Sequence, residues 1–214
     1  MAFIPDLPTL LAFMLAAFVL TITPGPDMTL FLGRTLSEGR AAGMAAMLGA
    51  ASGIVVHTSL AAFGISALIA ASPQAFFALK IVGAGYLVYL AIQAIRGGST
   101  FKLDAKAAAR PHSLLSNWLT GLGINLLNPK IVLFFVTFLP QFVSARDADV
   151  TGKLFFLGMF FIVLAVPMSI AMILAADRFA AALKRRPKVM RAIDWLFASV
   201  FSAFAVRILL TQGR

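Results

Sequence analysis

The sequence predicts an all-α integral membrane bundle of six transmembrane helices, built as a 3+3 inverted repeat with a broken first helix in each half. Three observations support this fold class. Of the 214 residues, 61% are hydrophobic and 12% are charged, whereas about 25% of residues are charged in soluble domains. Six apolar stretches have the length of about 20 residues that a bilayer core requires. Prolines beside a charged residue interrupt the first and the fourth of these stretches.

The six stretches follow one another in a single transmembrane domain, 1–214. No Lys or Arg precedes the first stretch, so we expect a retained helix rather than a cleavable signal peptide, which needs a basic start. The only long polar loop, 96–115, divides the domain into halves of about 1–95 and 116–214. We expect the spans near residues 7–33, 41–71, 74–95, 116–143, 152–176 and 192–211.

Lys and Arg are concentrated in the first, third and fifth loops. Because positively charged loops stay in the cytoplasm, we expect the linker 96–115 to be cytoplasmic and both termini to face outward. The net charge of +10 does not indicate a nucleic-acid partner, because the basic residues lie in short loops between apolar spans. The expected surroundings are a lipid bilayer.

The two interrupted stretches resemble each other. The first contains "PGPDMTLF" and the fourth contains "LNPKIVLF". Aligning Pro26 with Pro129 places Asp27 opposite Lys130 and matches a Leu-Phe pair at the same offset. Transporters are often built from inverted repeats whose substrate site lies on discontinuous helices at the repeat interface. We therefore expect the two breaks to face each other inside the bilayer.

The prolines explain why the helices break. Proline has no N–H, so Pro24, Pro26 and Pro129 deprive the carbonyls of Leu20, Ile22 and Asn125 of their helical donors. Gly25 removes steric resistance to bending. Free carbonyls are tolerated at membrane depth only where protein or a water-lined cavity satisfies them. Each half-helix after a proline also presents unpaired N–H groups. Facing breaks would form a polar pocket suited to the carboxylate and ammonium of an amino acid.

Asp27 and Lys130 are the charged residues that we expect well inside the membrane. Each costs about 2.5–3.5 kcal/mol or more at the centre of a span, so each should have a partner or a function. We expect them to line the pocket and at times to pair with each other. Asp27 would receive a substrate ammonium or a coupling proton, and Lys130 the carboxylate. The alternative is a structural ion pair that locks the two halves together.

Further polar residues near the breaks have two interpretations each. Thr23 could bond to a freed carbonyl or face the substrate, and Asn128 could support the backbone at Pro129 or bind. His57 could relay a proton near neutral pH or bond to a neighbouring carbonyl. Gly49 and Gly53 lie on the same stripe as His57 and indicate close helix packing. The sequence also allows a homodimer through such small-residue faces.

The sequence does not indicate an enzyme. There is no cysteine, which excludes disulfides, thiolate catalysis and cysteine-ligated metal sites. Ser52 and His57 are five residues apart and do not face each other on a helix. There is no HExxH motif and no phosphate-binding glycine loop. We expect no catalytic residues, no cofactor and no metal site.

With these motifs the chain resembles the LysE/RhtB superfamily of amino-acid exporters, in the homoserine/threonine-resistance branch. The similar segments are "TPGPD" at 23–27, "NLLNPK" at 125–130 and "GAGYLVYLAIQAIRG" at 83–97. The resemblance implies that the motif residues form the functional centre; these are Pro24, Gly25, Pro26, Asp27, Asn128, Pro129 and Lys130.

The resemblance also implies a secondary transporter of the bacterial inner membrane, driven by the proton-motive force. Its substrates would be amino acids or derivatives: a neutral amino acid, threonine, homoserine or homoserine lactone. The alternative is a passive channel, or an exporter of another small solute or ion. A structural membrane protein is a third class, but it would not need charges beside two related helix breaks.

Overall fold

The computed structural model describes residues 3–97, 111–176, 178 and 187–211. Helices make up almost all of this part of the chain, which contains no strand. The predicted all-α class is therefore confirmed. The helices are α1 Leu7–Ile22, α2 Pro26–Glu38, α3 Arg40–Ala71, α4 Pro73–Gly97, α5 Leu114–Leu127, α6 Pro129–Leu133, α7 Val150–Leu174 and α9 Pro187–Thr211.

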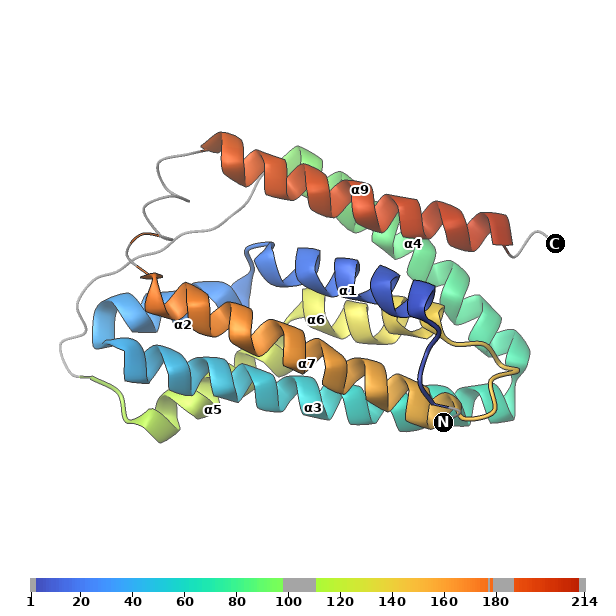
Figure 1. Ribbon diagram of the computed structural model, residues 1–214, viewed down its shortest axis with the longest axis horizontal. Helices are drawn as coiled ribbons and strands as arrows, with labels where there is room; N and C mark the ends of the chain where they lie inside the picture. The colour runs from blue at the N-terminus through green and yellow to red at the C-terminus, as the bar shows by residue number, and fades with distance from the viewer. Residues whose placement is uncertain (1–2, 98–110, 177, 179–186, 212–214) are drawn as a thin grey trace.

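The helices lie roughly along one axis and alternate in direction when the bent pairs α1–α2 and α5–α6 are each taken as one segment (Figure 1). The start of α1 and the end of α9 lie at the same end of the molecule, and the junction between α2 and α3 lies at the other end. Helices α4 and α9 pack side by side along one edge. Most of the predicted linker, 96–115, lies outside the described residues.

Both predicted helix breaks are present. Helices α1 and α2 meet at an angle of 50° across Pro24, and α5 and α6 meet at 51° before Pro129. Beyond the second break, α6 widens into a π-helical turn, Phe134–Phe138, and tightens into a 3₁₀ turn, Leu139–Phe142. The sequence analysis did not anticipate these two irregular turns.

Two apolar clusters fill the interior on either side of the breaks. The larger is rich in phenylalanine, with Phe13 of α1, Phe134 and Phe138 beyond the second break, and Phe161 of α7. The smaller joins α2, α3 and α7. Its buried side chains are Met28, Phe31, Leu32, Ala46, Met47, Met172, Ile173 and Ala176. The breaks thus lie between two packed regions.

The small-residue stripe of α3 packs against α5. A Cβ atom on Gly49 would lie 1.9 Å from the backbone oxygen of Trp118, and one on Gly121 would lie 2.0 Å from that of Ala46. A Cβ on Gly53 would lie 2.4 Å from Oδ1 of Asn125. The packing interpretation of these glycines is confirmed. Because this face of α3 is occupied within the chain, a homodimer would have to use another surface.

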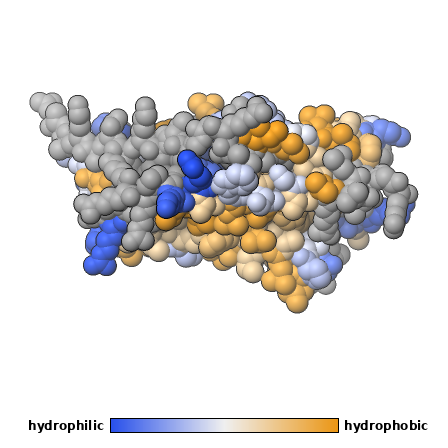
Figure 2. Space-filling view, turned by 90° about the horizontal axis from the view of Figure 1, so that it is seen from above, coloured by the Kyte–Doolittle hydropathy of each residue, from blue (hydrophilic) through white to orange (hydrophobic). Residues whose placement is uncertain are grey.

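The outer surface of the bundle is apolar. Figure 2 shows hydrophobic residues over the middle of one face and hydrophilic residues mainly toward its two ends. Of the described helices, α3 and α7 are long and apolar enough to cross a membrane, and the two bent pairs raise this to four spans if each pair is one span. A membrane location fits this surface, and the count of six spans stays a prediction.

Candidate functional site

The first break leaves backbone carbonyls that a residue of the second break satisfies. The chain leaves α1 after Ile22, and the Thr23 hydroxyl donates to the carbonyl of Val19 at 2.6 Å. The ammonium of Lys130 donates to the carbonyls of Leu20, at 2.8 Å, and of Thr23, at 2.6 Å. The Leu20 carbonyl is one of those that the prolines were expected to free. A cation at a helix C-terminus is also favoured by the helix dipole.

The second break is closed by shorter-range contacts. The Asn125 carbonyl, freed by Pro129, accepts from the N–H of Asn128 at 3.1 Å and lies 3.3 Å from Nε2 of His57. Oδ1 of Asn128 accepts from the N–H of Lys130 at 3.1 Å and so caps α6. Asn128 therefore supports the backbone at Pro129, which is the first of the two interpretations given for it above.

The charges that follow the two breaks make reciprocal contacts. Asp27, at the start of α2, accepts a hydrogen bond of 2.7 Å from the amide of Asn125 near the end of α5. Lys130, at the start of α6, donates to the end of α1. Each charge thus contacts the other broken pair just before its break. No ion pair joins Asp27 to Lys130 among the salt bridges of the described residues.

A cavity lies between the two breaks. Its water-accessible volume is about 80 Å³, and one water molecule needs about 10–15 Å³ by the same measure. Five of its lining residues come from the breaks, and mostly apolar side chains of α1, α2, α3, α6 and α7 form the remaining walls. The five are Thr23, Gly25, Asp27, Asn128 and Lys130. Several waters or a small solute would fill this space.

One oxygen of Asp27 is left for the cavity. Oδ2 accepts from Asn125, but Oδ1 is buried and has no hydrogen-bond partner. A buried carboxylate oxygen without a donor is costly. Asp27 lines the cavity and its carboxyl group also interacts with Asn128, yet one of its oxygens remains an unsatisfied acceptor, whereas Lys130 already donates two hydrogen bonds to the protein.

His57 and the three prolines do not line the cavity. His57 is buried behind the second break, where its ring stacks on Phe135 with centroids 5.8 Å apart. Pro24, Pro26 and Pro129 shape the backbone around the cavity. Within the described part of the chain, no group of three His, Cys, Asp or Glu side chains could hold a metal ion.

Two residues of α9 that lie beside Lys130 were not predicted from the sequence. Asp194 is buried and interacts electrostatically with Lys130. The Lys130 ammonium also lies 5.9 Å from the centre of the Phe197 ring. Asp194 and Phe197 are three residues apart and share a helix face, which the sequence reveals. The expectation that only Asp27 and Lys130 are charged residues of the interior is therefore wrong, because α9 also brings an acid there.

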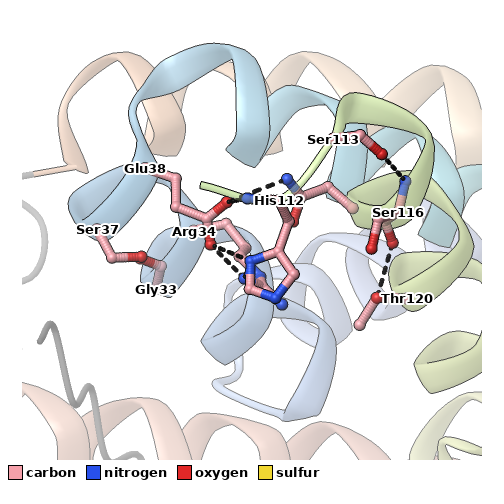
Figure 3. A network of polar contacts seen from close by, with 9 residues as sticks. Gly33, Arg34, Ser37, Glu38, His112, Ser113, Ser116 and Thr120 are labelled. Carbon is pink, nitrogen blue, oxygen red and sulfur yellow. Dashed lines mark hydrogen bonds and ion pairs between the residues drawn. The ribbon is translucent and has the colours of Figure 1, made fainter. Parts of the chain in front are cut away.

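A second polar cluster ties the halves together at the end of the molecule opposite the termini (Figure 3). The side chain of Glu38, 1% exposed, pairs with Arg34 one turn earlier. It also accepts hydrogen bonds from the backbone N–H of His112, at 2.9 Å, and from the amide of Asn117, at 3.4 Å. This carboxylate joins the end of α2 to the start of α5.

Comparisons with known proteins agree with this arrangement. The family model described as LysE type translocator matches residues 18–212. An uncharacterized membrane protein of Bacillus subtilis is 35% identical over 165 residues, covering 74% of this chain and 78% of its own. The homoserine/homoserine lactone efflux protein of Salmonella typhimurium is 29% identical over 190 residues, covering 89% and 90%.

A leucine efflux protein of Klebsiella pneumoniae is also 29% identical, over 209 residues that cover 95% of each chain. No solved structure matches the chain significantly. The family model spans nearly the whole sequence, both helix breaks included. It describes translocators, which are transporters and not enzymes. The chain is a membrane protein that belongs to the LysE family of translocators.

Proposed function

We propose that this protein exports amino acids or close derivatives across the bacterial inner membrane in exchange for protons, with the cavity between the two breaks as its substrate site. The observation that carries the proposal is the unsatisfied Oδ1 of Asp27, buried beside a cavity that both breaks line. The printed names of the efflux relatives support the substrate class.

The cavity offers complementary groups to a zwitterion. Oδ1 of Asp27 accepts a hydrogen bond from the substrate ammonium, or it takes up a proton when no substrate is bound. Lys130 donates two of its three N–H groups to backbone carbonyls, and the third serves the substrate carboxylate. Thr23 and Asn128 line the same space and hold the backbone around it. Because one carboxylate serves both ligands, substrate and proton compete, and competition for one site is sufficient for antiport.

We assign His57 to the support of the second break. Its ring bonds to the freed Asn125 carbonyl and is separated from the cavity lining. In this arrangement the proton is carried by Asp27, and His57 holds in place the residue that bonds to Asp27.

A 3+3 inverted repeat across six spans accommodates this site. The bends of 50° and 51° at the two breaks are nearly equal, and the contacts of Asp27 and Lys130 are reciprocal. The alternating helix directions and the common end of the termini support the same topology. With the basic loops in the cytoplasm, both termini face outward, and the Glu38 cluster lies at the cytoplasmic end.

The direct test is gradient-driven uptake into inverted membrane vesicles, whose outer face is the cytoplasmic one. Labelled homoserine, homoserine lactone, threonine, leucine and lysine would be offered with the vesicle lumen acidified. We expect uptake of at least one compound that a protonophore abolishes. Uptake that is equal with and without the gradient would indicate the alternative, a passive channel. Absence of uptake for the whole panel would contradict the proposal.

A further inference from the structure

Ser169 of α7 is a polar group of the cavity that neither break supplies. The other polar lining residues are Thr21, Thr23, Asp27, Asn128 and Lys130, all within a few residues of a break. Ser169 is 9% exposed and lines the cavity from a different helix. It lies between Val166 and Ile170, which pack against the smaller apolar cluster. A hydroxyl group is therefore placed in an otherwise apolar wall.

The hydroxyl of Ser169 has no hydrogen-bond partner among the residues that the structure describes. Eight other serines and threonines on the described helices donate to the carbonyl four residues earlier, as Thr35 does to Phe31 at 2.6 Å. Ser169 makes neither this bond to Ala165 nor another hydrogen bond within the described part of the chain. Buried hydroxyls are normally satisfied by protein, by water or by a ligand. The cavity is the space from which a partner for Ser169 would come.

The walls around Ser169 restrict what that partner is. Met28 and Phe31 of α2 and Met47 of α3 line the same cavity. A substrate whose charged groups engage Asp27 and Lys130 has to lay its side chain against these apolar groups. Ser169 is then the lining group outside the breaks that hydrogen-bonds to that side chain.

We propose that Ser169 determines specificity by hydrogen-bonding to a hydroxyl on the substrate side chain. The substrate class is an amino acid with a short hydroxylated side chain, preferred over its aliphatic isostere. This inference rests on the proposed function and adds the residue that selects among neutral amino acids. A site that bonds to a substrate hydroxyl disfavours an analogue that lacks it, because its own polar group is left unpaired.

The size of the preference follows from the freedom of the serine. When an aliphatic substrate binds, Ser169 can turn to the Ala165 carbonyl, as the other helical hydroxyls do. The Ser169 hydroxyl is therefore not left unpaired when an aliphatic substrate binds. We expect a preference for the hydroxylated substrate of about tenfold, which is smaller than the preference that a rigid buried donor gives.

The test uses pairs of substrates that differ only by hydroxyl against methyl: homoserine against norvaline, and threonine against valine. Uptake efficiency, kcat/KM, would be measured for each compound in inverted vesicles under the acid-lumen gradient. The proteins are the unchanged chain, Ser169→Ala, Ser169→Cys, Ser169→Thr and a matched control, Ser59→Ala. Ser59 already donates to the Val55 carbonyl on α3, away from the cavity.

We expect the unchanged chain, Ser169→Thr and Ser59→Ala to prefer the hydroxylated member of each pair by about tenfold. In Ser169→Ala and Ser169→Cys the preference should fall to near one, with uptake of norvaline and valine retained. Equal uptake within both pairs by the unchanged chain, or an unaltered preference in Ser169→Ala, would overturn the inference while leaving the exporter in place. Absence of gradient-driven uptake of all four compounds, with uptake of leucine, lysine or homoserine lactone retained, would overturn the inference alone, whereas absence of uptake for that whole panel as well would overturn both.

Discussion

At both helix breaks proline leaves a backbone carbonyl without its helical donor, and different residues replace that donor at the two breaks. At the first, Thr23, Pro24 and Gly25 separate α1 from α2, which begins at Pro26, and a freed carbonyl is satisfied by a lysine from the other half. At the second, one proline follows an asparagine that caps α6 directly, and a nearby histidine approaches the freed carbonyl. The first break depends on its partner, whereas the second is largely closed by its own half and by α3.

The difference separates the roles of the two charges. Lys130 is held by two carbonyls of the first break. Asp27 has one engaged oxygen and one unsatisfied oxygen. Both charges thus contact the other half, and only the acid keeps an oxygen without a hydrogen-bond partner among the described residues. Changes at the two breaks should accordingly differ in what they disturb.

The largest effect is expected from Asp27→Asn. The amide oxygen can still accept from Asn125, but it carries no charge and takes up no proton. We expect proton-coupled uptake to fall by more than about 100-fold, equivalent to about 3 kcal/mol, with normal membrane insertion. Asp6→Asn is the matched control, because Asn also caps a helix and Asp6 lies outside the cavity. Undiminished uptake by Asp27→Asn would remove the assigned role of the acid.

A smaller effect is expected from Gly53→Ala, which sharpens the role of Asn125. The added methyl group would lie 2.4 Å from Oδ1 of Asn125 and displace the amide from Asp27. We expect uptake to fall about tenfold, or about 1.4 kcal/mol. Gly64→Ala on the same helix has nothing within 4 Å of its added Cβ and should retain full uptake. Equal behaviour of the two variants would mean that the link from Asn125 to Asp27 does not matter for transport.

Asp194→Asn tests whether α9 contributes to the second break. Removing this buried charge weakens the electrostatic stabilisation of Lys130. We expect uptake to fall about fivefold, or about 1 kcal/mol. The control is Asp147→Asn, which should change uptake little. Asp147 lies in the connection before α7 and pairs with Lys153 in the first turn of α7. If both variants match the unchanged chain, α9 does not influence the site through this residue.

The smallest effect is expected from His57→Gln. Glutamine keeps an N–H donor for the Asn125 carbonyl, so uptake should stay within about twofold of that of the unchanged chain. The dependence of uptake on pH should also be unchanged, because in the proposed mechanism Asp27, and not His57, carries the proton. A shifted pH profile with a normal amount of inserted protein would instead assign proton transfer to His57.

The sequence predicted the helices and their breaks because both depend on local features. Apolar stretches of sufficient length set the helices, and Pro24, Pro26 and Pro129 mark where two of them bend. The stripe of glycines on α3 also predicted close packing, because residues without a side chain let a neighbouring helix approach the backbone.

The partners of the long side chains could not be predicted in the same way. Lys130 was expected to line the pocket and at times to pair with Asp27; it interacts electrostatically with Asp27, but its hydrogen bonds go to backbone carbonyls of the opposite half, which the sequence does not reveal. Asp194 and Ser169 are buried, and only the packing of α9 and α7 brings them to Lys130 and to the cavity. Likewise, the glycine face proposed for a dimer proved to be used by α5.

Cross-linking of paired cysteines tests most directly whether the two breaks share the substrate cavity. The chain has no native cysteine, so Thr23→Cys with Ile131→Cys, two positions that line the cavity from opposite breaks, can be treated with a short bifunctional thiol reagent in intact membranes. Thr23→Cys with Ser144→Cys, in the connection between α6 and α7, serves as the control pair. We expect rapid cross-linking of the first pair alone, slowed by a transported amino acid. If each cysteine reacts singly but the first pair is not cross-linked, or if no substrate slows the reaction, the two breaks do not form the substrate site.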